Sequence, residues 1–349
     1  MPGCPGEKSM SYRIALNFED GATRIVECKE GEKVLDAAYR QKVNLPMDCS
    51  DGVCGTCKCR CEQGEYDLGD DYIDDALTAD EADEGLILTC QMVPSSDCVI
   101  QVPVPSTACK IVPVEHAATV KTVELASEDT IILTLTLDNP EALAFLPGQY
   151  VNLFVPGTEE HRSYSFSSKP GTAEASFVIR NVPDGLMSGW LVNKAQPGDR
   201  MRFVGPNGSF FLRSATRPVL MLAGGTGLAP ILSILEVLAD QGTDQPIHLV
   251  YGVSFEKGLV ELKRLNSFAE RLPRFSYATC VSHPESENVL KGHVTDHIGD
   301  EYFHGGNVDV YLCGPPPMVE AVRGTLRNRG VAPVNFYYEK FASTEAVPA

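Results

Sequence analysis

Four cysteines have the spacing that an iron–sulfur cluster needs. Cys49, Cys54 and Cys57 follow the arrangement C-x4-C-x2-C, and 32 residues separate Cys57 from Cys90, which we expect at the start of a strand. This spacing matches the plant-type [2Fe–2S] pattern, in which four thiolates hold two irons. We therefore predict that these four cysteines ligate a [2Fe–2S] cluster.

The loop that carries the first three cysteines supports this prediction. Gly52 and Gly55 allow the backbone to approach a cluster closely and to aim N–H groups at its bridging sulfides. A structural zinc site is the alternative, because Cys59 and Cys61 follow the loop and could complete a tetrahedron. The distant Cys90 fits iron better. We expect the surplus cysteines to behave as small hydrophobes: Cys59, Cys61, Cys4, Cys28, Cys98 and Cys109.

An acidic segment follows the cysteine-rich loop. From Glu62 to Glu84 there are 11 acidic residues and no basic one. The acids can form a solvated face, with some of them near a helix N-terminus. They can equally form a docking surface for a partner with basic charge, in which case the encounter rate would depend on salt.

A polar motif further along, Arg162-Ser163-Tyr164-Ser165, is predicted on a strand. Because side chains alternate along a strand, Arg162 and Tyr164 face the same side. The planar arginine fork suits a phosphate, and the tyrosine ring suits the flat ring system of a flavin. Ser165 could hydrogen-bond the edge of that ring. These residues predict a flavin site.

A second phosphate-binding device follows. Gly185, Met187 and Ser188 open a predicted helix, and the unpaired N–H groups at a helix N-terminus can take a pyrophosphate. Together with Arg162 this makes two phosphate-binding devices, which favours FAD over FMN.

A glycine-rich turn lies between an apolar strand, residues 219–223, and a predicted helix, the context that a nucleotide-binding turn requires. The turn consists of Gly224, Gly225, Thr226 and Gly227, with Pro230 three residues later. Pro230 takes the place of the third glycine of G-x-G-x-x-G, and we expect it to begin the helix. This points away from lactate-type dehydrogenases.

Two other positions bear on the nicotinamide cofactor. Cys313 and Gly314 follow a predicted strand, residues 308–312, and could wall the nicotinamide pocket; Cys313 as mere packing is the alternative. Glu256 follows another strand, where an acid repels the 2′-phosphate of NADPH, although the adjacent Lys257 would attract it. We therefore predict NADH as the reductant.

The elements that position these residues form three modules in series. A hairpin, a helix from residue 34 and strands at residues 86–92 and 99–104 indicate a β-grasp ferredoxin domain. Short strands separated by Pro/Gly turns indicate a six-stranded antiparallel FAD-binding barrel, and strands alternating with helices indicate a parallel-sheet α/β NAD-binding domain. The predicted fold class is thus multidomain, α+β and α/β. The predicted boundaries are 1–10 for a flexible leader, 11–108, 111–213 and 214–349.

Composition limits the partners. The net charge of −18 argues against nucleic acid, because no basic stripe is visible. Residues 218–235 carry no charge, but their glycines and proline argue against a membrane span. Twelve cysteines without a secretory leader indicate reduced thiols in the cytoplasm, where metal ligation is the usual use.

The chain resembles a known family, the reductase components of bacterial aromatic-ring dioxygenases of the benzoate and toluate 1,2-dioxygenase type. These are members of the ferredoxin–NAD reductase family with an N-terminal plant-type ferredoxin domain. The passages that carry the resemblance are MDCSDGVCGTCK from Met47, DDYIDDALT from Asp70, RSYSFSS from Arg162, GGTGLAP from Gly224, YLCGPPPM from Tyr311 and YEKF from Tyr338.

The resemblance implies a role for each motif. It places the four spaced cysteines on the cluster, Arg162, Tyr164, Ser165 and residues 185–188 on FAD, and residues 224–230 with Cys313 and Gly314 on NADH. Glu339 and Phe341 match family positions close to the flavin, where an aromatic ring can cover the isoalloxazine. Ser165, Cys313 and Glu339 are the expected catalytic residues.

The same resemblance implies a partner, the oxygenase component of a Rieske-type dioxygenase, docked by the ferredoxin domain. Electrons would pass from NADH through FAD to the [2Fe–2S] cluster and on to that oxygenase. Reductases of soluble di-iron monooxygenases share this layout and remain an alternative. A non-catalytic iron–sulfur carrier or redox sensor is the alternative from a different class.

Overall fold

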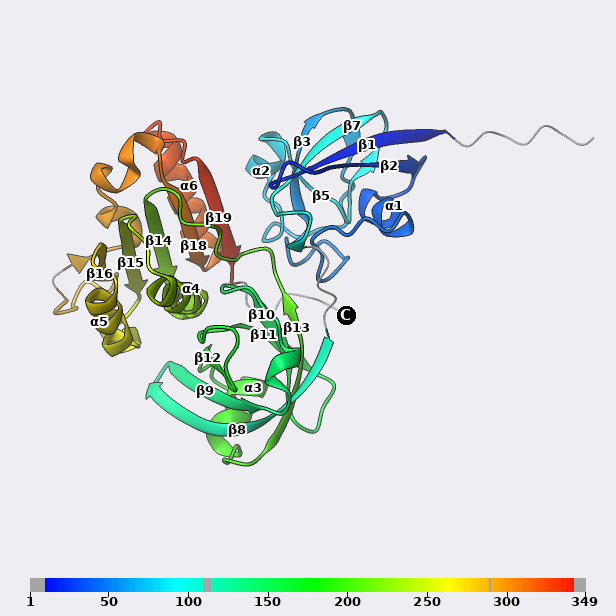
Figure 1. Cartoon of the computed structure of the whole chain (residues 1–349). Helices are drawn as coiled ribbons and strands as arrows, with labels where there is room; N and C mark the ends of the chain where they lie inside the picture. The colour runs from blue at the N-terminus through cyan, green and yellow to red at the C-terminus, as the bar shows by residue number, and fades with distance from the viewer. Residues whose placement is uncertain (1–9, 109–113, 289, 342–349) are drawn as a thin grey trace, which may run out of the picture. The chain divides into compact units, whose positions relative to one another are not determined.

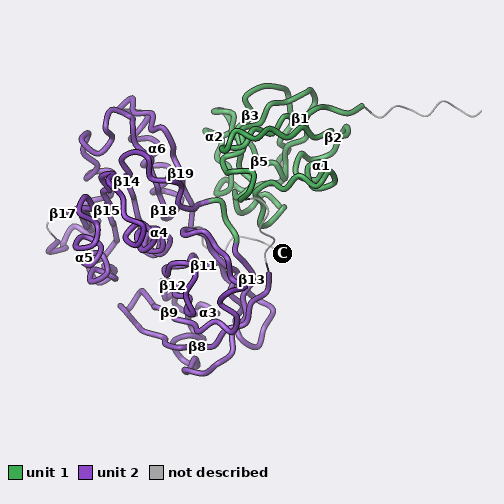
Figure 2. Tube along the Cα trace, in the orientation of Figure 1, with its two compact units in different colours: residues 1–112, 207–209 green, residues 113–206, 210–349 purple. Residues whose placement is uncertain are grey.

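The computed structural model describes residues 10–108, 114–288 and 290–341. The described chain divides into two compact units (Figure 2). The N-terminal unit is Met1–Val112 with Asn207–Ser209, and the C-terminal unit is Pro113–Pro206 with Phe210–Ala349. The predicted leader, apart from Met10, lies outside the described residues, as do Cys4 and Cys109.

The N-terminal unit has the predicted β-grasp fold. Its described residues form a five-stranded sheet in the order β2-β1-β7-β3-β5, with β1 antiparallel to β2 and parallel to β7. Ile14, Leu16 and Phe18 alternate inward from β1 and are buried. The elements are β1 (Ser11–Phe18), β2 (Thr23–Lys29), α1 (Val34–Arg40), β3 (Lys58–Gln63), β4 (Tyr66–Asp67), α2 (Ala79–Asp83), β5 (Leu86–Leu88), β6 (Val93–Pro94) and β7 (Cys98–Val102).

Two expectations for this unit were wrong. The strand expected at residues 86–92 ends at Leu88, whose carbonyl accepts hydrogen bonds from the N–H groups of Gln91 and Met92. The backbone therefore turns, and Cys90 lies in this turn instead of at the start of a strand. Strand β3 begins at Lys58, directly after the cysteine loop, and contains Cys59 and Cys61.

The first half of the C-terminal unit is an antiparallel barrel (Figure 1). Its six described strands follow the order β11-β10-β13-β8-β9-β12, and a bridge between Phe166 and Phe177 links the two end strands. The rings of Phe166 and Phe145 stack in the core with centroids 3.8 Å apart. The elements are β8 (Val114–Ser127), β9 (Thr130–Leu137), η2 (Pro140–Ala142), β10 (Tyr150–Phe154), β11 (His161–Ser165), β12 (Glu174–Arg180), α3 (Leu186–Asn193) and β13 (Arg200–Asn207).

The second half of the unit is a parallel sheet of the predicted α/β type, covered by helices (Figure 1). Over the described residues its order is β17-β16-β15-β14-β18-β19, and β14 and β18 are buried along their whole length. The strands are β14 (Val219–Gly224), β15 (Ile247–Val253), β16 (Phe275–Val281), β17 (Leu290–Lys291), β18 (Asp309–Gly314) and β19 (Asn335–Lys340). The helices are η3 (Gly225–Gly227), α4 (Leu228–Gln241), η4 (Glu256–Gly258), α5 (Leu262–Arg271), η5 (Val294–His297), η6 (Asp300–Gly306) and α6 (Pro316–Asn328).

The charge-free segment 218–235 is divided among β14, η3 and the start of α4. Within the residues that the structure describes, no helix has both the length and the apolar character that crossing a bilayer requires. Helix α4 begins at Leu228, so Pro230 occupies its third position and does not begin it as expected. Proline is tolerated there because the first-turn N–H groups have no partner within the helix.

Candidate cofactor sites

The four predicted cluster ligands approach one another in two pairs in the described N-terminal unit. The Sγ atoms of Cys57 and Cys90 lie 3.2 Å apart. The thiols of Cys49 and Cys54 are hydrogen-bonded to each other. A cluster of two irons takes two thiolates on each iron, so the donor set fits it. Over the described ranges, no three Cys, His, Asp or Glu side chains form a group that could hold one metal ion.

Hydrogen bonding places one stabilised thiolate in each pair. The hydrogen bond from the Cys54 thiol lowers the pKa of Cys49 to about 5, and it raises the pKa of Cys54. In the same way, the hydrogen bond between Cys57 and Cys90 lowers the pKa of Cys90 and raises that of Cys57. One thiol of each pair, Cys49 or Cys90, is therefore favoured as the thiolate, which is the metal-binding form.

The backbone of the cluster loop takes conformations that favour glycine. Gly52 has a φ of +77°, and a Cβ there would lie 2.6 Å from the carbonyl oxygen of Asp71. The N–H of Gly52 is hydrogen-bonded to the sulfur of Cys90, and the N–H of Asp51 donates to Sγ of Cys49 at 3.5 Å. The loop thus directs N–H groups at the sulfurs of the predicted ligands.

A buried ion pair beside this loop was missed in the sequence. Nζ of Lys58, the residue after Cys57, lies 2.8 Å from Oε2 of the fully buried Glu81. Glu81 also forms a capping box with Thr78 at the start of α2. The Thr-x-x-Glu spacing was the signal that could have revealed it. One acid of the acidic segment is therefore structural, while the other ten are exposed.

The predicted flavin residues lie on β11, as expected. Tyr164 is partly buried against the barrel core, and burial raises the pKa of its hydroxyl. Arg162 makes an ion pair with Glu160 at 3.4 Å and donates to the carbonyl of His161. Both side chains are partly buried, unlike those of their neighbours His161 and Ser163, as the predicted alternation requires.

The predicted pyrophosphate residues lie at the first turn of α3. Gly185 is the N-cap residue, and a Cβ there would lie 2.4 Å from Oγ of Ser188 and 2.9 Å from the carbonyl oxygen of Val182. Ser188 donates to that same carbonyl at 2.9 Å, and Met187 is buried in the barrel core. Ser188 therefore fixes the chain entering the helix, a structural role that the sequence did not predict.

The three predicted catalytic side chains meet within the C-terminal unit. Oγ of Ser165 donates to Oε2 of Glu339 at 3.3 Å, and Sγ of Cys313 lies 3.9 Å from the same oxygen. Residues 313 and 339 are register partners on β18 and β19. Burial first, and the Glu339 carboxylate second, raise the pKa of the Cys313 thiol. The hydroxyl of Ser165 and the neutral thiol of Cys313 thus both contact the Glu339 carboxylate, between the barrel and the parallel sheet.

Two contacts from the α/β half hold the chain just after Ser165. Oγ of Ser233 on α4 donates to the carbonyl of Ser168 at 2.7 Å. Nη2 of Arg264 on α5 donates to the carbonyl of Ser167, also at 2.7 Å. Neither residue was predicted as functional, since no local pattern marks a hydrogen bond to a distant backbone. These two hydrogen bonds join the segment that follows β11 to helices α4 and α5 of the α/β half.

The glycine turn lies at the carboxyl end of β14, where it faces the end of β18. A Cβ at Gly227 would lie 2.2 Å from the carbonyl oxygen of Cys313, and one at Gly224 would lie 2.5 Å from Sδ of Met318. A Cβ at Gly314 would lie 2.7 Å from Sδ of Met318 and 3.4 Å from Cα of Gly224. Around Gly225 there is open space. Two neighbouring parallel strands thus end in glycines, which leaves a cradle for a nucleotide at the usual edge of such a sheet.

We expect Gly227→Ala to destabilise the C-terminal unit by about 1–3 kcal/mol, because the added methyl overlaps a backbone carbonyl that cannot rotate away. Urea unfolding of the purified protein measures this. Gly324→Ala is the matched control, since nothing lies within 4 Å of a Cβ there and the residue is inside α6. The control should be neutral or slightly stabilising. Equal stability of both variants would contradict the expectation.

Glu256 lies in η4, just beyond the carboxyl end of β15. Its Oε2 accepts a hydrogen bond from the N–H of Glu287 at 3.3 Å. The neighbouring Lys257, which weakened the prediction of NADH, is bound to two acids of the barrel, Glu128 and, at 3.8 Å, Asp129. The lysine is therefore held by acids away from the glutamate.

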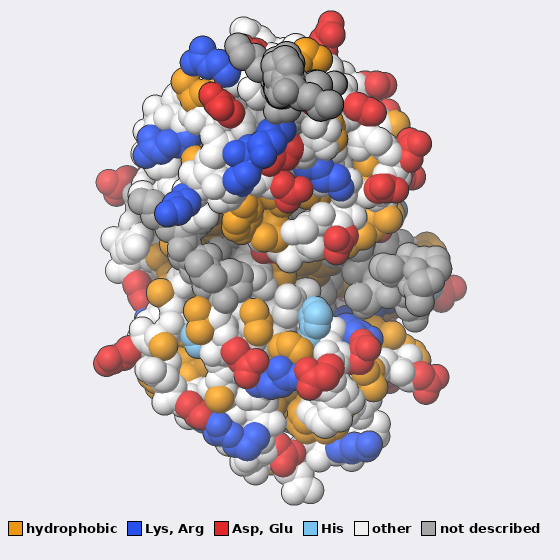
Figure 3. Space-filling model, turned by 90° about the vertical axis from the view of Figure 1, so that its right-hand side faces the viewer, with side chains coloured by type: hydrophobic (Ala, Val, Ile, Leu, Met, Phe, Trp, Pro, Cys, Tyr) orange, Lys and Arg blue, Asp and Glu red, His pale blue; other side chains and the backbone are white. Residues whose placement is uncertain are grey.

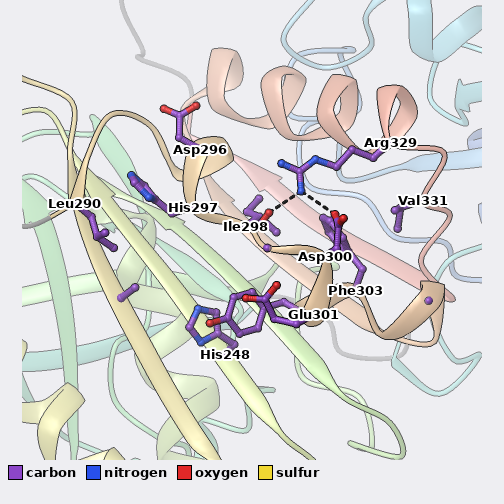
Figure 4. A pocket seen from close by; sticks show the side chains of 14 residues that line it. His248, Leu290, Asp296, His297, Ile298, Asp300, Glu301, Phe303, Arg329 and Val331 are labelled. Atoms are coloured by element: carbon purple, nitrogen blue, oxygen red, sulfur yellow. Dashed lines mark hydrogen bonds and ion pairs between the residues drawn. The ribbon is translucent and has the colours of Figure 1, made fainter.

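A cavity of about 1000 Å³ lies elsewhere on the α/β half (Figure 4). It is lined by residues of η5, η6 and the sheet, with the ring of Tyr302 stacked on His248 at 3.7 Å. Arg329 closes one side through hydrogen bonds to Ile298 and Asp300. None of the predicted cofactor residues lines it, so this cavity is distinct from the nucleotide edge.

Three family models match the chain. A 2Fe–2S iron–sulfur cluster binding domain matches residues 17–95, an oxidoreductase FAD-binding domain residues 117–212, and an oxidoreductase NAD-binding domain residues 221–324. With the fold and the convergence of the three side chains, these domains define an iron–sulfur flavoprotein of the ferredoxin–NAD reductase type.

Comparison with known proteins narrows the class. The chain is 52% identical over 335 residues to the toluate 1,2-dioxygenase electron transfer component of Pseudomonas putida, covering 96% of this chain and 100% of that one. It is 48% identical to the 2-halobenzoate 1,2-dioxygenase electron transfer component of Burkholderia cepacia, covering 96% and 99%. It is 33% identical to the propane 2-monooxygenase reductase component of Gordonia, covering 91% and 94%. The chain belongs to the family of reductase components of benzoate/toluate-type aromatic-ring dioxygenases.

A solved structure supports the fold over the whole chain. The cytochrome P450 reductase of Amycolatopsis superposes with a TM-score of 0.69 at 32% identity, covering 95% of this chain and 99% of that one. This protein is accordingly an NADH-dependent flavoprotein reductase that transfers electrons in an oxygenase system.

Proposed function

We propose that this chain takes a hydride from NADH onto FAD and delivers single electrons, through its [2Fe–2S] cluster, to a dioxygenase that acts on a benzoate- or toluate-like acid. The observation that carries the proposal is the convergence of Ser165, Cys313 and Glu339 between the barrel and the glycine-rich edge of the sheet. That arrangement supports hydride transfer between a flavin on the barrel and a nicotinamide on the parallel sheet, because the barrel supplies Ser165 and the sheet supplies Cys313 and Glu339.

Each group of residues has a role in this proposal. Cys49, Cys54, Cys57 and Cys90 hold the cluster. Arg162 and the N-terminus of α3 bind the phosphates of FAD, Tyr164 covers its ring, and the aromatic ring of Phe341 covers the isoalloxazine until nicotinamide displaces it. The N–H of Phe341 donates to the carbonyl of Gly314 at 2.9 Å, which ties the two cofactor sites together.

The chain's own contribution to hydride transfer is positioning. When bound, the flavin exchanges a hydride with nicotinamide and single electrons with the cluster. The Ser165 hydroxyl orients the ring edge, and Glu339 orients the hydroxyl and can hold or release a proton there. Cys313 remains neutral because of its burial, and the open space around Gly225 admits the nucleotide at the end of β14.

An absorption spectrum tests the proposal most directly. Purified protein should show flavin bands and the reddish-brown absorption of a [2Fe–2S] cluster, and both should bleach after NADH is added. Missing flavin bands, or no bleaching, would favour the non-catalytic carrier or sensor. A colourless cysteine site would favour zinc. Activity with an aromatic-acid dioxygenase, compared with a di-iron monooxygenase, would separate the two oxygenase partners.

We expect Glu256→Gln to reduce the preference for NADH over NADPH by about tenfold, because a neutral side chain no longer repels a 2′-phosphate. The ratio of kcat/KM for the two cofactors, measured with ferricyanide as acceptor, shows the change. Glu285→Gln is the control, since it removes another exposed acid from the loop after β16, which contacts Glu256 through the N–H of Glu287. An unchanged ratio in both variants would remove Glu256 from cofactor selection.

Docking by the ferredoxin domain is proposed from the acidic segment between Glu62 and Glu84. Ten of its acids are exposed. On the face shown in Figure 3, lysine and arginine side chains lie among acidic ones, so net charge alone does not make a uniform surface. The proposal therefore depends on this segment and not on the total charge of the chain.

Electron transfer to the oxygenase should slow at least about tenfold when the ionic strength is raised from about 0.01 M to about 1 M, because the Debye length falls from about 30 Å to about 3 Å. Stopped-flow mixing of reduced protein with its oxygenase measures the rate. Reduction of the flavin by NADH is the internal control. A flat profile would assign the acids to the solvated face alone.

A further inference from the structure

Two cysteines outside the cluster ligands lie together in the N-terminal unit. Cys61 is on β3 and Cys98 is the first residue of β7, the strand antiparallel to β3. Their thiols are hydrogen-bonded to each other. By contrast, the buried thiol of Cys28 donates to the carbonyl of Glu32, and Cys280 is a buried free cysteine of the C-terminal unit. Cys61, Cys98 and Cys28 were expected from the sequence to behave as small hydrophobes, and no expectation was stated for Cys280.

The strand register explains why these two thiols meet. Cys61 pairs with Ile100, and Cys98 lies two residues before Ile100, so both cysteines point to the same face in diagonal positions. A bulge between Cys61 and Gln63 interrupts the ladder at this point. The bulge leaves Glu62 unpaired and bends β3 next to Cys61.

A glycine leaves the space that the pair uses. A Cβ at Gly64 would lie 2.5 Å from Sγ of Cys98 and 2.6 Å from the carbonyl oxygen of Asp97. Gly64 also has a φ of +111°, which other residues rarely adopt. Any larger residue at position 64 would overlap the Cys98 thiol and the backbone beside it, so glycine is needed here for the thiol to keep its position.

The two thiols differ in access. Cys98 is buried, with 2% of its surface exposed, whereas Cys61 is partly exposed. The hydrogen bond from Cys98 lowers the pKa of Cys61. A small oxidant can therefore reach the thiol that more readily forms a thiolate, while its buried neighbour is placed to resolve the product.

We propose that Cys61 and Cys98 are a dithiol site that hydrogen peroxide converts to a disulfide across the β3–β7 bulge. Peroxide is the by-product of a reduced flavin exposed to dioxygen, so the oxidant arises from the chain's own redox chemistry. In the first step the Cys61 sulfur attacks peroxide, its O–O bond breaks, and sulfenic acid and water form. In the second step Cys98 sulfur attacks the sulfenic sulfur, an S–S bond forms, and a second water leaves.

The bridge would have a structural effect on the cluster module. It would close residues 61–98, the segment that contains Cys90, into a covalent loop anchored on the strand that follows Cys57. Closing such a loop restricts the unfolded chain. The oxidised protein should therefore lose its cluster absorption at a higher temperature than the reduced protein, and dithiothreitol should reverse the shift.

The full-length holoprotein, treated with one equivalent of hydrogen peroxide and then N-ethylmaleimide, tests the site. Digestion and mass spectrometry should find a peptide joining Cys61 to Cys98, two hydrogens lighter than its parts. Cys98→Ser should give no such peptide and should instead be labelled by dimedone at Cys61. Cys28→Ser, which changes a buried cysteine elsewhere in the unit, should behave as the parent.

The visible spectrum of the cluster, recorded in every sample, shows that each variant is folded. The proposal is overturned if the linked peptide is absent while the cluster spectrum is intact, or if Cys28 is oxidised as fast as Cys61. A linked peptide without the reversible thermal shift would retain the site and overturn the stabilising effect.

Discussion

Cys57→Ser should abolish electron delivery beyond the flavin while leaving the flavin reducible by NADH. Cys57 is 2% exposed and its sulfur lies 3.2 Å from that of Cys90, so its loss leaves one of the two thiol pairs with a single sulfur. Serine binds iron far less well than a thiolate, and a cluster with three good ligands in this loop should not persist. Iron content and the sulfide-to-iron absorption measure the loss.

Two assays separate loss of the cluster from loss of the fold. Ferricyanide, which takes electrons from the flavin directly, should still be reduced by NADH at the parent rate. Reduction of the oxygenase should be lost completely. Cys59→Ser is the matched control, because Cys59 is as buried as Cys57 and lies two residues away but is not a proposed ligand. Loss of iron in both variants would contradict the ligand assignment.

The second large effect is expected where Ser165 of the barrel meets Glu339 and Cys313 of the parallel sheet. Ser165→Ala should slow the reduction of FAD by NADH about 10²-fold, because it removes the hydroxyl that orients the reacting ring edge. Ser165 is 4% exposed and its hydroxyl donates to Glu339. Water therefore has little access to take over the hydrogen bond that the alanine variant loses. Stopped-flow absorbance of the flavin measures the rate.

A neighbouring serine supplies the control for this prediction. Ser163 lies two residues earlier on the same strand, is exposed and donates to Oδ1 of Asn152 at 2.8 Å. Ser163→Ala should leave the rate unchanged. Glu339→Gln keeps a hydrogen-bond partner for Ser165 but removes the charge, so a slow rate there would assign Glu339 to proton handling. Parent rates in Ser165→Ala would exclude the serine from hydride transfer.

Some errors in the sequence-based prediction have local causes. The run at residues 86–92 is apolar, which predicts a longer strand, but Leu88 accepts two hydrogen bonds that close a turn. The last strand, β19, was not predicted because all its side chains are partly buried and show no alternation. Its formation depends on pairing with β18, which no local pattern reveals.

The cluster cysteines, the flavin motif and the glycine turn are predictions that the sequence alone supplies. Each of these depends on spacing within a short segment, which local backbone geometry converts directly into a shape. The family and the order of the three domains could be predicted from the sequence for the same reason.

Only the tertiary structure decided which distant side chains meet. Ser165 and Glu339 are 174 residues apart in the sequence. Their contact depends on the register of β19 beside β18 and on the packing of β11 next to β19. Cys61 and Cys98 likewise meet because the register of β3 against β7 brings both to the same face of the sheet. A register shift of one residue would reverse the direction of every side chain, so these contacts depend on the whole sheet.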